Sequence, residues 1–456
     1  MTGVTGQAPR SLTSDEVPQS RTAKAPFPPE LWAEAVYSRR AIPATLATGR
    51  PAPGRAEAEP DPLPDEPRLP LASPPLHLAP SPDAPAGLSD PAVLAALLHY
   101  SHGLLQHDLT PGGWPLHRAV ASARCRYPSE LTLVTPNASF RFDPLHHQLA
   151  LLHGSVMRHQ EDEAGATRFI VITSRFARTA RLYGDYAPRL CAQEAGMLLG
   201  AVHLVAAALG LRARPGQDQE TLNELCADWL PTTGEHPMGY LEIERSATAG
   251  PRSTTGPRHP ANRAWPPPEL ASVLRSRHSG AAIFDPEPAL APGELLTDLD
   301  AALAAAPFGD FSCHLLVQRV TGFSPGHYVH SDGQLRQVRD RDPLALLEQI
   351  GQTEGRVSMN FRSTACTAYL AVGRGTAVAR HGDDAFRRLH LSAGAAAHLL
   401  CVAAARHGLS ARIHNGYDAA TAERLLGLAP GEETVLFQVA IGAARPGAAF
   451  RVPVVF

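Results

Sequence analysis

Arginines and a serine that could hold a phosphate stand close together in one short segment. Residues 274–303 read LRSRHSGAAIFDPEPALAPGELLTDLDAAL, which places Arg275, Arg277 and Ser279 at the end of an expected helix. A guanidinium group donates paired hydrogen bonds that match phosphate oxygens, and a serine hydroxyl adds another donor. A solvated helix end would carry the same residue types, so this segment alone leaves both interpretations open.

A second segment predicts a turn that leads into a strand. Residues 118–131 read RAVASARCRYPSEL, with Ser122, Ala123 and Arg124 at the expected turn. Taken alone, this segment indicates a turn and no chemistry.

A third segment could bring its backbone close to a ligand. Residues 412–418 read RIHNGYD, in which His414 and Asn415 precede Gly416. Because glycine has no side chain, the backbone there can approach a ligand closely. A simple turn is the alternative interpretation of this segment.

Composition nearly excludes lysine chemistry. The 41 basic residues comprise one lysine, Lys24, and 40 arginines. A Schiff base, a P-loop lysine or a lysine general base would need a lysine in a folded segment, whereas Lys24 lies in a Ser/Thr/Pro-rich tail. A GC-rich genome accounts for the same bias, since Ala and Pro are abundant as well.

Other classes of function are disfavoured by charge, cysteine and histidine patterns. The formal net charge is −3, so no basic excess indicates nucleic acid. Neither CxxC nor HExxH occurs, so we expect free thiols and no metal site. No apolar run reaches about 18 residues, and no secretory signal is visible, which predicts a cytoplasmic protein without a membrane span. The cysteines are 125, 191, 226, 313, 366 and 401.

Two proline-rich or polar segments divide the chain. Residues 41–90 contain 13 prolines and predict an extended arm, because each proline removes a backbone donor. A second break separates two longer folded parts. We therefore predict a flexible tail, a first half that includes the arm, a linker and a second half; their bounds are 1–28, 29–245, 246–268 and 269–456.

The two halves are related in sequence. Gly184–Arg214 aligns with Gly382–Arg412 at a constant offset of 198, and 12 of the 31 positions are identical. Both segments carry a helix, expected at 190–210 and 388–408, that is apolar nearly all round and must be covered on every side. A duplicated domain is therefore predicted, whose two helices pack together as an intramolecular pseudo-dimer.

These segments, in this order, resemble the nitroreductase-like flavoproteins. More narrowly, they resemble the SagB-type azoline dehydrogenases of thiazole/oxazole-modified peptide biosynthesis. That family has an Arg-Arg-Ser helix start and an Arg-x-x-Pro-Ser-x-Gly-Ala-x-Tyr-Pro-x-Glu loop. In this chain Ala121 stands for the proline of the loop and Arg124 for its glycine. The loop residues that carry the resemblance are Arg118, Ala121, Ser122, Arg124, Cys125, Tyr127, Pro128 and Glu130.

The resemblance implies an α+β fold, duplicated in tandem here, with FMN held between the two halves. One site would combine the three segments with Arg445 or Arg451 near the C-terminus. The other would need residues 304–314, where the loop pattern is lost, so one functional FMN per chain is expected, although both sites could have been lost. The implied FMN contacts are Arg275, Arg277, Ser279, Ser122, Ala123, Arg124, His414, Asn415, Gly416 and Arg451.

The family oxidises an azoline in a peptide to an azole, and a base must take a ring proton. The family's adjacent Lys and Tyr correspond here to Leu182 and Tyr183, so only the tyrosine is present. Tyr183 would need a nearby cation, such as Arg181 or Arg189, to act as a base. His381, at the equivalent position of the second half, is the rival base.

The resemblance thus implies a dehydrogenase acting on a modified precursor peptide of the thiopeptide kind, with cyclodehydratase proteins as partners. Two alternatives remain at this point. One is another FMN-dependent oxidoreductase that uses NAD(P)H, which the missing lysine favours. The other is a non-catalytic relative that binds a peptide or a partner enzyme.

Overall fold

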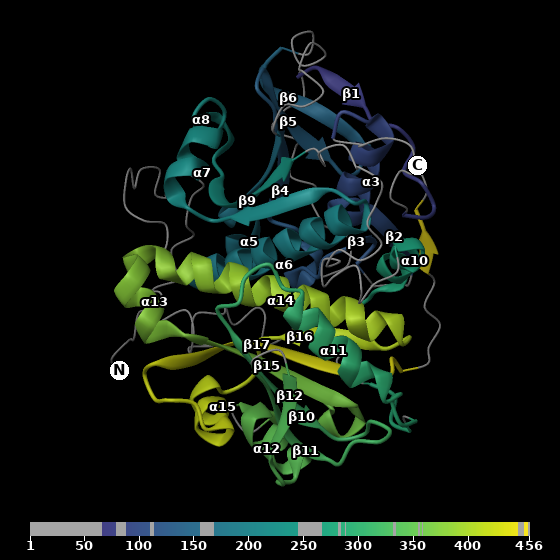
Figure 1. Ribbon diagram of the computed structural model, residues 1–456, viewed down its shortest axis with the longest axis vertical. Coiled ribbons are helices and arrows are strands. Elements are labelled where there is room, and N and C mark those ends of the chain that lie inside the picture. The colour runs from purple at the N-terminus through teal and green to yellow at the C-terminus, as the bar shows by residue number, and fades with distance from the viewer. Residues whose placement is uncertain are drawn as a thin grey trace, which may run out of the picture.

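Two antiparallel sheets lie on opposite sides of a pair of long helices in the computed structural model of the chain (Figure 1). Sheets and helices occupy separate layers, so the α+β class is confirmed. The tail and nearly all of the expected linker fall outside the described residues. These residues are 66–78, 88–109, 114–155, 168–244, 267–280, 284–287, 289–331, 334–353, 356–357, 359–445 and 451–454.

The first half carries a seven-stranded sheet in the order β1-β6-β5-β4-β7-β9-β8. Its strands are β1 (Arg68–Pro70), β4 (Ser129–Val134), β5 (Ala138–Asp143), β6 (Gln148–Gly154), β7 (Arg168–Ser174), β8 (Arg212–Gly216) and β9 (His236–Glu244). The helices of this half are α3 (Pro91–His102), α5 (Phe176–Tyr183), α6 (Ala187–Ala208), α7 (Gln219–Cys226) and α8 (Leu230–Thr233).

The second half carries a six-stranded sheet in the order β12-β11-β10-β15-β17-β16. Its strands are β10 (Ser312–Val317), β11 (Gly326–Ser331), β12 (Gln334–Arg339), β15 (Cys366–Gly373), β16 (Ser410–His414) and β17 (Glu433–Gly442), and β13 (Gln352–Thr353) pairs separately with β14 (Arg356–Val357). Its helices are α10 (Pro267–Ser276), α11 (Glu294–Ala304), α12 (Pro343–Gly351), α13 (Arg374–His381), α14 (Ala385–Arg406) and α15 (Ala419–Leu426).

Corresponding elements follow one another in the same order in both halves. Each half contains a central strand, a short helix, a long helix, an edge strand, a capped helix and a returning strand, in that order. In the first half these are β7, α5, α6, β8, α7 and β9. In the second half they are β15, α13, α14, β16, α15 and β17. Even the caps match, since Asp218 accepts from the Thr221 amide and Asp418 accepts from the Thr421 amide. Three further strands precede these elements in each half, β4–β6 in the first and β10–β12 in the second.

The predicted long helices form the centre of the molecule. Helices α6 and α14 each start three residues before the expected position and lie side by side between the sheets (Figure 1). At their crossing, a glycine of each helix contacts the backbone of the other helix. A Cβ added at Gly196 would lie 2.7 Å from the His390 carbonyl oxygen. A Cβ added at Gly394 would lie 2.7 Å from the Gln193 carbonyl oxygen. Only glycine permits so close an approach at both positions.

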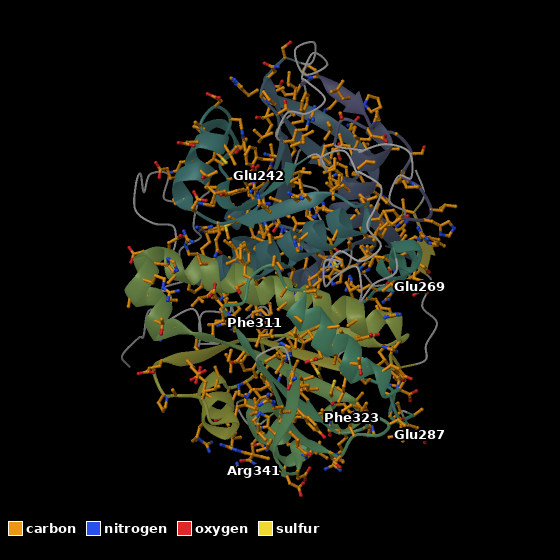
Figure 2. The ribbon with its side chains drawn as sticks, in the orientation of Figure 1. Glu242, Glu269, Glu287, Phe311, Phe323 and Arg341 are labelled. Carbon is orange, nitrogen blue, oxygen red and sulfur yellow. The ribbon has the colours of Figure 1, made fainter. Side chains whose placement is uncertain are left out.

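One continuous apolar core runs through both halves. It contains, for example, Leu198 of α6 and Leu399 of α14. Side chains fill the space between each sheet and the central helices (Figure 2), and Phe311 packs partly buried against this core. Helix α6 and residues 374–406 are long and apolar enough to cross a bilayer, but 94% of each apolar window is buried inside the protein. Burial inside the protein is typical of core helices.

The C-terminal segment of the second half joins the first half. Strand β18 (Arg451–Pro453) pairs with β2 (Leu104–Asp108), which pairs with β3 (Leu116–Arg118). Figure 1 shows β18, in yellow, beside β2 and α10. Strand β18 therefore lies where the two halves meet.

The described part of the proline-rich arm packs on the chain itself. Strand β1 pairs with the edge strand β6, and Leu78 is fully buried. The Tyr100 hydroxyl donates to the Pro75 carbonyl oxygen at 2.6 Å, which holds this segment against α3. Residues 66–78 therefore cover an edge of the first sheet, a protection that exposed edges need.

Candidate functional site

A cavity of about 460 Å³ lies between the two halves, within the size range of small-molecule sites. The first half contributes Trp114, His117, Val120, Ala121, Ser122, Ala123, Arg124, Cys125, Tyr127, Tyr183, Tyr186, Leu190, Gln193, Glu194 and Met197. The second half contributes Arg277, His278, Ser279, Gly280, Arg412, Ile413, His414, Asn415, Gly416 and Arg451.

Most of the residues singled out in the sequence line this one cavity. They come from segments far apart in the chain, and the crossing of α6 and α14 brings these segments together. The expected site residues on the cavity wall are Ser122, Ala123, Arg124, Tyr183, Arg277, Ser279, His414, Asn415, Gly416 and Arg451.

Two expected site residues, Arg275 and His381, are not on the cavity wall. Arg275 donates to the Tyr100 hydroxyl at 2.5 Å and to the Leu76 carbonyl oxygen at 2.9 Å, so it ties α10 to the arm. His381 ends α13, where desolvation and nearby Arg388 lower its pKa. Arg445 does not line the cavity either.

Arg277 presents unsatisfied donors to the cavity. Its side chain is 5% exposed, and its Nη2 donates to the Arg118 carbonyl oxygen at 3.3 Å. Its Nε and Nη1 have no partner among the described residues. A buried guanidinium without an anionic partner is costly, so this position suits an anionic ligand.

Two further arginines add positive charge to the same wall. Arg412 donates to the Gly280 carbonyl oxygen at 3.0 Å, its Nε has no partner among the described residues, and desolvation lowers its pKa. Arg451 pairs with Asp108 at 3.2 Å. Desolvation and the charges of Arg451 and Arg277 lower the pKa of His278 to about 4, so this imidazole is neutral near pH 7.

The loop after β3 lines the cavity in an uncommon backbone conformation. Arg124, Cys125 and Tyr127 have φ values of 52°, 52° and 45°, in the left-handed region that favours glycine. Arg124 stands where the resembling family has its glycine, the residue type that this left-handed conformation favours. Strain of this kind persists where the surroundings hold it in place and is common at functional sites.

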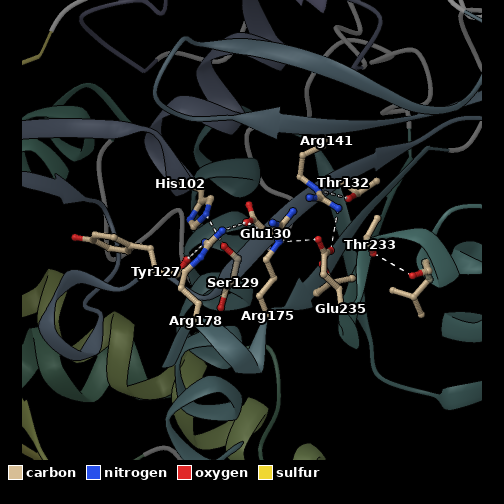
Figure 3. A network of polar contacts seen from close by, with 12 residues as sticks. His102, Tyr127, Ser129, Glu130, Thr132, Arg141, Arg175, Arg178, Thr233 and Glu235 are labelled. Atoms are coloured by element: carbon tan, nitrogen blue, oxygen red, sulfur yellow. Dashed lines mark hydrogen bonds and ion pairs between the residues drawn. The ribbon is translucent and has the colours of Figure 1, made fainter. Parts of the chain in front are cut away.

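A buried ionic network holds this loop from behind (Figure 3). Arg178 donates to the Tyr127 carbonyl oxygen at 2.6 Å and to Glu130 at 2.9 Å. Arg175 connects Glu130, at 3.4 Å, to Glu235, at 2.9 Å. Although desolvation opposes it, these arginines lower the pKa of Glu130 to about 2. The network therefore fixes the loop by charge-assisted bonds.

Two adjacent polar residues of α6 face the cavity. Gln193 and Asn415 exchange amide hydrogen bonds of 2.9 and 3.3 Å, which joins α6 to the second half. Glu194, 2% exposed, accepts from the Ser129 amide at 3.4 Å. Burial raises the pKa of Glu194 to about 7.

Tyr183 is paired with a cation other than the expected ones. Arg124 is hydrogen-bonded to its hydroxyl, whereas Arg189 points to the Leu436 carbonyl oxygen at 2.9 Å. Desolvation outweighs the Arg124 charge and raises the pKa of Tyr183. The phenol therefore keeps its proton at neutral pH and acts as a hydrogen-bond donor rather than as a base.

Sequence reasoning missed several residues of the wall: Gln193, Glu194, Arg412, His117 and His278. Gln193 and Glu194 stand opposite Leu391 and Ser392 in the alignment of the halves. The sequence did contain a signal for these two wall residues. Gln193 and Glu194 form a polar pair within an otherwise apolar helix, and the second copy lacks that pair.

Residues 274–443 match the Nitroreductase family. The structure matches a nitroreductase-like protein from Anabaena variabilis with a TM-score of 0.62 and 20% identity, over 92% of this chain and 98% of that chain. Because this match spans both halves, the nitroreductase-like α+β fold extends over nearly the whole chain.

Two smaller matches reach lower scores. A nitroreductase-like protein from Ralstonia eutropha has a TM-score of 0.29 and 20% identity, over 40% of this chain and all of that one. The E. coli microcin synthetase McbBCD complex with truncated pro-MccB17 has a TM-score of 0.27 and 13% identity, over 37% of this chain and 62% of that one. No curated protein matches the chain by sequence.

Proposed function

We propose that the chain is an FMN-dependent oxidoreductase with one flavin site, formed between two tandem nitroreductase-like halves that act as a pseudo-dimer. The observation that carries this proposal is the buried guanidinium of Arg277, whose Nε and Nη1 lack partners among the described residues beside a cavity lined by both halves. An anionic phosphate ester supplies what this guanidinium lacks.

Contacts that repeat at the 198-residue offset support the tandem arrangement. Arg189 of α6 donates to the Leu436 carbonyl oxygen of β17, and Arg387 of α14 donates to the Met238 carbonyl oxygen of β9. The two donor residues are 198 positions apart in the sequence, and so are the two acceptor residues. We infer that an ancestral homodimer contact is kept twice within one chain, with domains at 29–245 and 269–456.

The residues present fit FMN. Arg277, Arg412 and Arg451 would hold its phosphate, with Ser279 as a hydroxyl partner. The loop at Ala123 and the Asn415–Gly416 turn would border the rest of the molecule. A bound FMN would supply two-electron oxidation or reduction of a substrate.

The chain's own residues prepare the cavity for that chemistry. Tyr183 holds its hydroxyl proton and can donate it to a ligand. The Gln193–Asn415 amide pair joins the two halves at the cavity wall and so orients both side chains there. The ionic network around Glu130 keeps the loop at Ser122 in place.

The reaction we propose is oxidation of an azoline to an azole in a ribosomally made peptide. The order of the three segments and the retained Tyr183 support it. The substrate would be a modified precursor peptide of the thiopeptide kind, presented by cyclodehydratase partners in the cytoplasm.

One observation favours a second candidate, a flavin reductase that uses NAD(P)H. The family lysine is absent, and the raised pKa of Tyr183 removes that phenol as a base. A reductase needs donors to its substrate and no base at this position.

One preparation distinguishes these functions. The purified chain is expected to be yellow, or to take up added FMN, and to remove two hydrogens from an azoline peptide by mass spectrometry without NAD(P)H. Turnover that requires NAD(P)H would replace the dehydrogenase by the reductase. A colourless chain that takes up no FMN would overturn both and leave a peptide-binding role.

A further inference from the structure

Glu194 is a buried carboxyl group on the wall of the cavity whose charge is not compensated by an ion pair. It lies on α6 next to Gln193, which bridges the two halves. Among the described residues no cation forms an ion pair with it. A buried acid in a pocket that also holds charged ligand-binding groups is a candidate for proton transfer.

Two neighbouring glutamates of the same half show how differently their surroundings act. Glu130 accepts from Arg178 at 2.9 Å and lies 3.4 Å from Arg175, and the pKa of this carboxyl falls to about 2. Glu194 has uncharged donors instead, and burial raises its pKa to about 7. Two carboxyl groups whose surroundings separate their pKa values mark a permanent anion and a group that exchanges protons.

The hydrogen bonds around Glu194 leave it able to accept a proton. The Tyr127 amide donates to Ser122 Oγ at 2.8 Å, so the Ser122 hydroxyl proton is available to the carboxylate. The Ser129 amide donates to Oε1 at 3.4 Å. These neutral donors orient the carboxylate without replacing the proton that it binds.

Three other ionisable groups on the wall have pKa values that are shifted away from neutral pH. Burial raises the pKa of Cys125 to about 11, and it also raises the pKa of Tyr183. Desolvation lowers the pKa of His117. The charged or titratable groups that face Glu194 from the elements around it are Arg118, Cys125, Tyr127, Arg178 and Cys191, with Arg277, Arg412 and His414 across the cavity.

We propose that Glu194 is the base that accepts the ring proton in the oxidation assigned above, in place of the missing family lysine. This inference rests on the proposed function. Oxidation of the azoline ring breaks two bonds to hydrogen. One hydrogen would leave with both bonding electrons to the oxidant, a chemistry that a bound FMN would supply. The other would leave as a proton to a Glu194 Oε atom, while its bonding electrons form the new ring double bond.

The first test needs no flavin and no turnover. Infrared difference spectra of the full chain, recorded against pH, are expected to show a carboxylic acid band that titrates near pH 7 and is absent from Glu194→Gln. Glu224→Gln, an exposed carboxyl of α7 changed in the same way, should keep the band. A band that persists in Glu194→Gln would overturn the proposal.

The second test uses the flavin-loaded chain and an azoline peptide. Glu194→Gln should bind FMN as the wild type does but convert the peptide about 10²- to 10⁴-fold more slowly, and the rise in rate with pH should vanish. Glu194→Asp, which keeps a carboxyl, should recover part of the rate with a pH profile. Equal rates and profiles in Glu194→Gln and the wild type would overturn the role of Glu194 alone, whereas a wild type without flavin or turnover would overturn the proposed function and this inference together.

Discussion

The two sides of the α6–α14 crossing have the same packing contacts but differ in the residues that could bind a ligand. On both sides the packing contacts recur at an offset of 198, as in the Arg189 and Arg387 bonds and the Gly196–Gly394 approach. One side opens into the cavity that holds Arg277. The contacts that hold the halves together have therefore been kept, while the residues that would bind a ligand have not.

The other side has lost polar groups at the matching positions. Leu391 and Ser392 replace Gln193 and Glu194. Arg214, the counterpart of Arg412, is mostly exposed and pairs with Glu242 at 3.1 Å. Two residues are missing from the first copy after Arg214, so Gly216 corresponds to Gly416. A Cβ added at Gly216 would lie 2.0 Å from the Tyr240 ring, so that ring fills the space beside the turn. Under the proposed duplication this difference is tolerated, because one intact site would suffice for one active centre per chain.

The largest expected difference concerns stability against pH. In the folded chain the pKa of Glu194 is about 7, against 4.5 for an exposed glutamate, so the native state binds this proton more tightly. The contribution to stability is present below pH 4.5 and is lost as pH rises through 7. Glu194→Gln should therefore gain up to about 3 kcal/mol over the wild type above pH 8. Denaturant titrations at several pH values would measure this, and a gain that is the same at pH 5 and pH 8 would refute it.

Removal of the Arg277 guanidinium, whose Nε and Nη1 have no partner among the described residues, should weaken FMN binding strongly. Arg277→Ala is expected to lower the affinity about 100-fold, or about 3 kcal/mol, because a charge-assisted contact to phosphate is lost. Quenching of flavin fluorescence gives the affinity. An unchanged affinity would mean that the phosphate binds elsewhere, and riboflavin, which lacks phosphate, should be insensitive to this change.

Equivalent substitutions at the helix crossing should lower the stability of the chain by the same amount. Gly196→Val and Gly394→Val each force a side chain against the facing backbone, and each should destabilise the chain by about 2 kcal/mol. Thermal unfolding followed by circular dichroism would compare them. A large loss from one substitution and none from the other would show that the crossing is not symmetric in energy.

A matched pair of arginines tests the asymmetry with a smaller effect. Arg412→Ala should weaken FMN binding about tenfold, or about 1.4 kcal/mol, while Arg214→Ala at the equivalent position should leave it unchanged. Both variants remove the same group from corresponding edge strands. Equal weakening by the two would indicate that flavin binds on both sides.

Much of the fold could be predicted because the repeat was visible in the residues. The Gly184–Arg214 and Gly382–Arg412 segments predicted two buried helices, and their packing places distant turns around one cavity. Both long helices start three residues before the expected positions, and at α6 the first turn contains Pro188, a residue that is tolerated there.

The polar wall was harder to predict. Glu194 lies in a helix that is apolar nearly all round, so its role depends on which neighbours the fold supplies. Arg275 lies in the last turn of α10 and Arg277 directly follows that helix, yet one contacts the arm and the other faces the cavity. Arg124 is in a left-handed conformation that its residue type does not predict, and the network around Glu130 contacts the same loop only at the Tyr127 carbonyl oxygen.

The flavin content of the purified chain tests the central claim most directly. FMN released by denaturation and measured by absorbance, divided by the protein concentration from amino-acid analysis, should saturate at one FMN per chain. The ratio should fall in Arg277→Ala and stay at one in Arg214→Ala. A ratio of two, or a chain that never takes up FMN, would contradict a single flavin site on one side of the crossing.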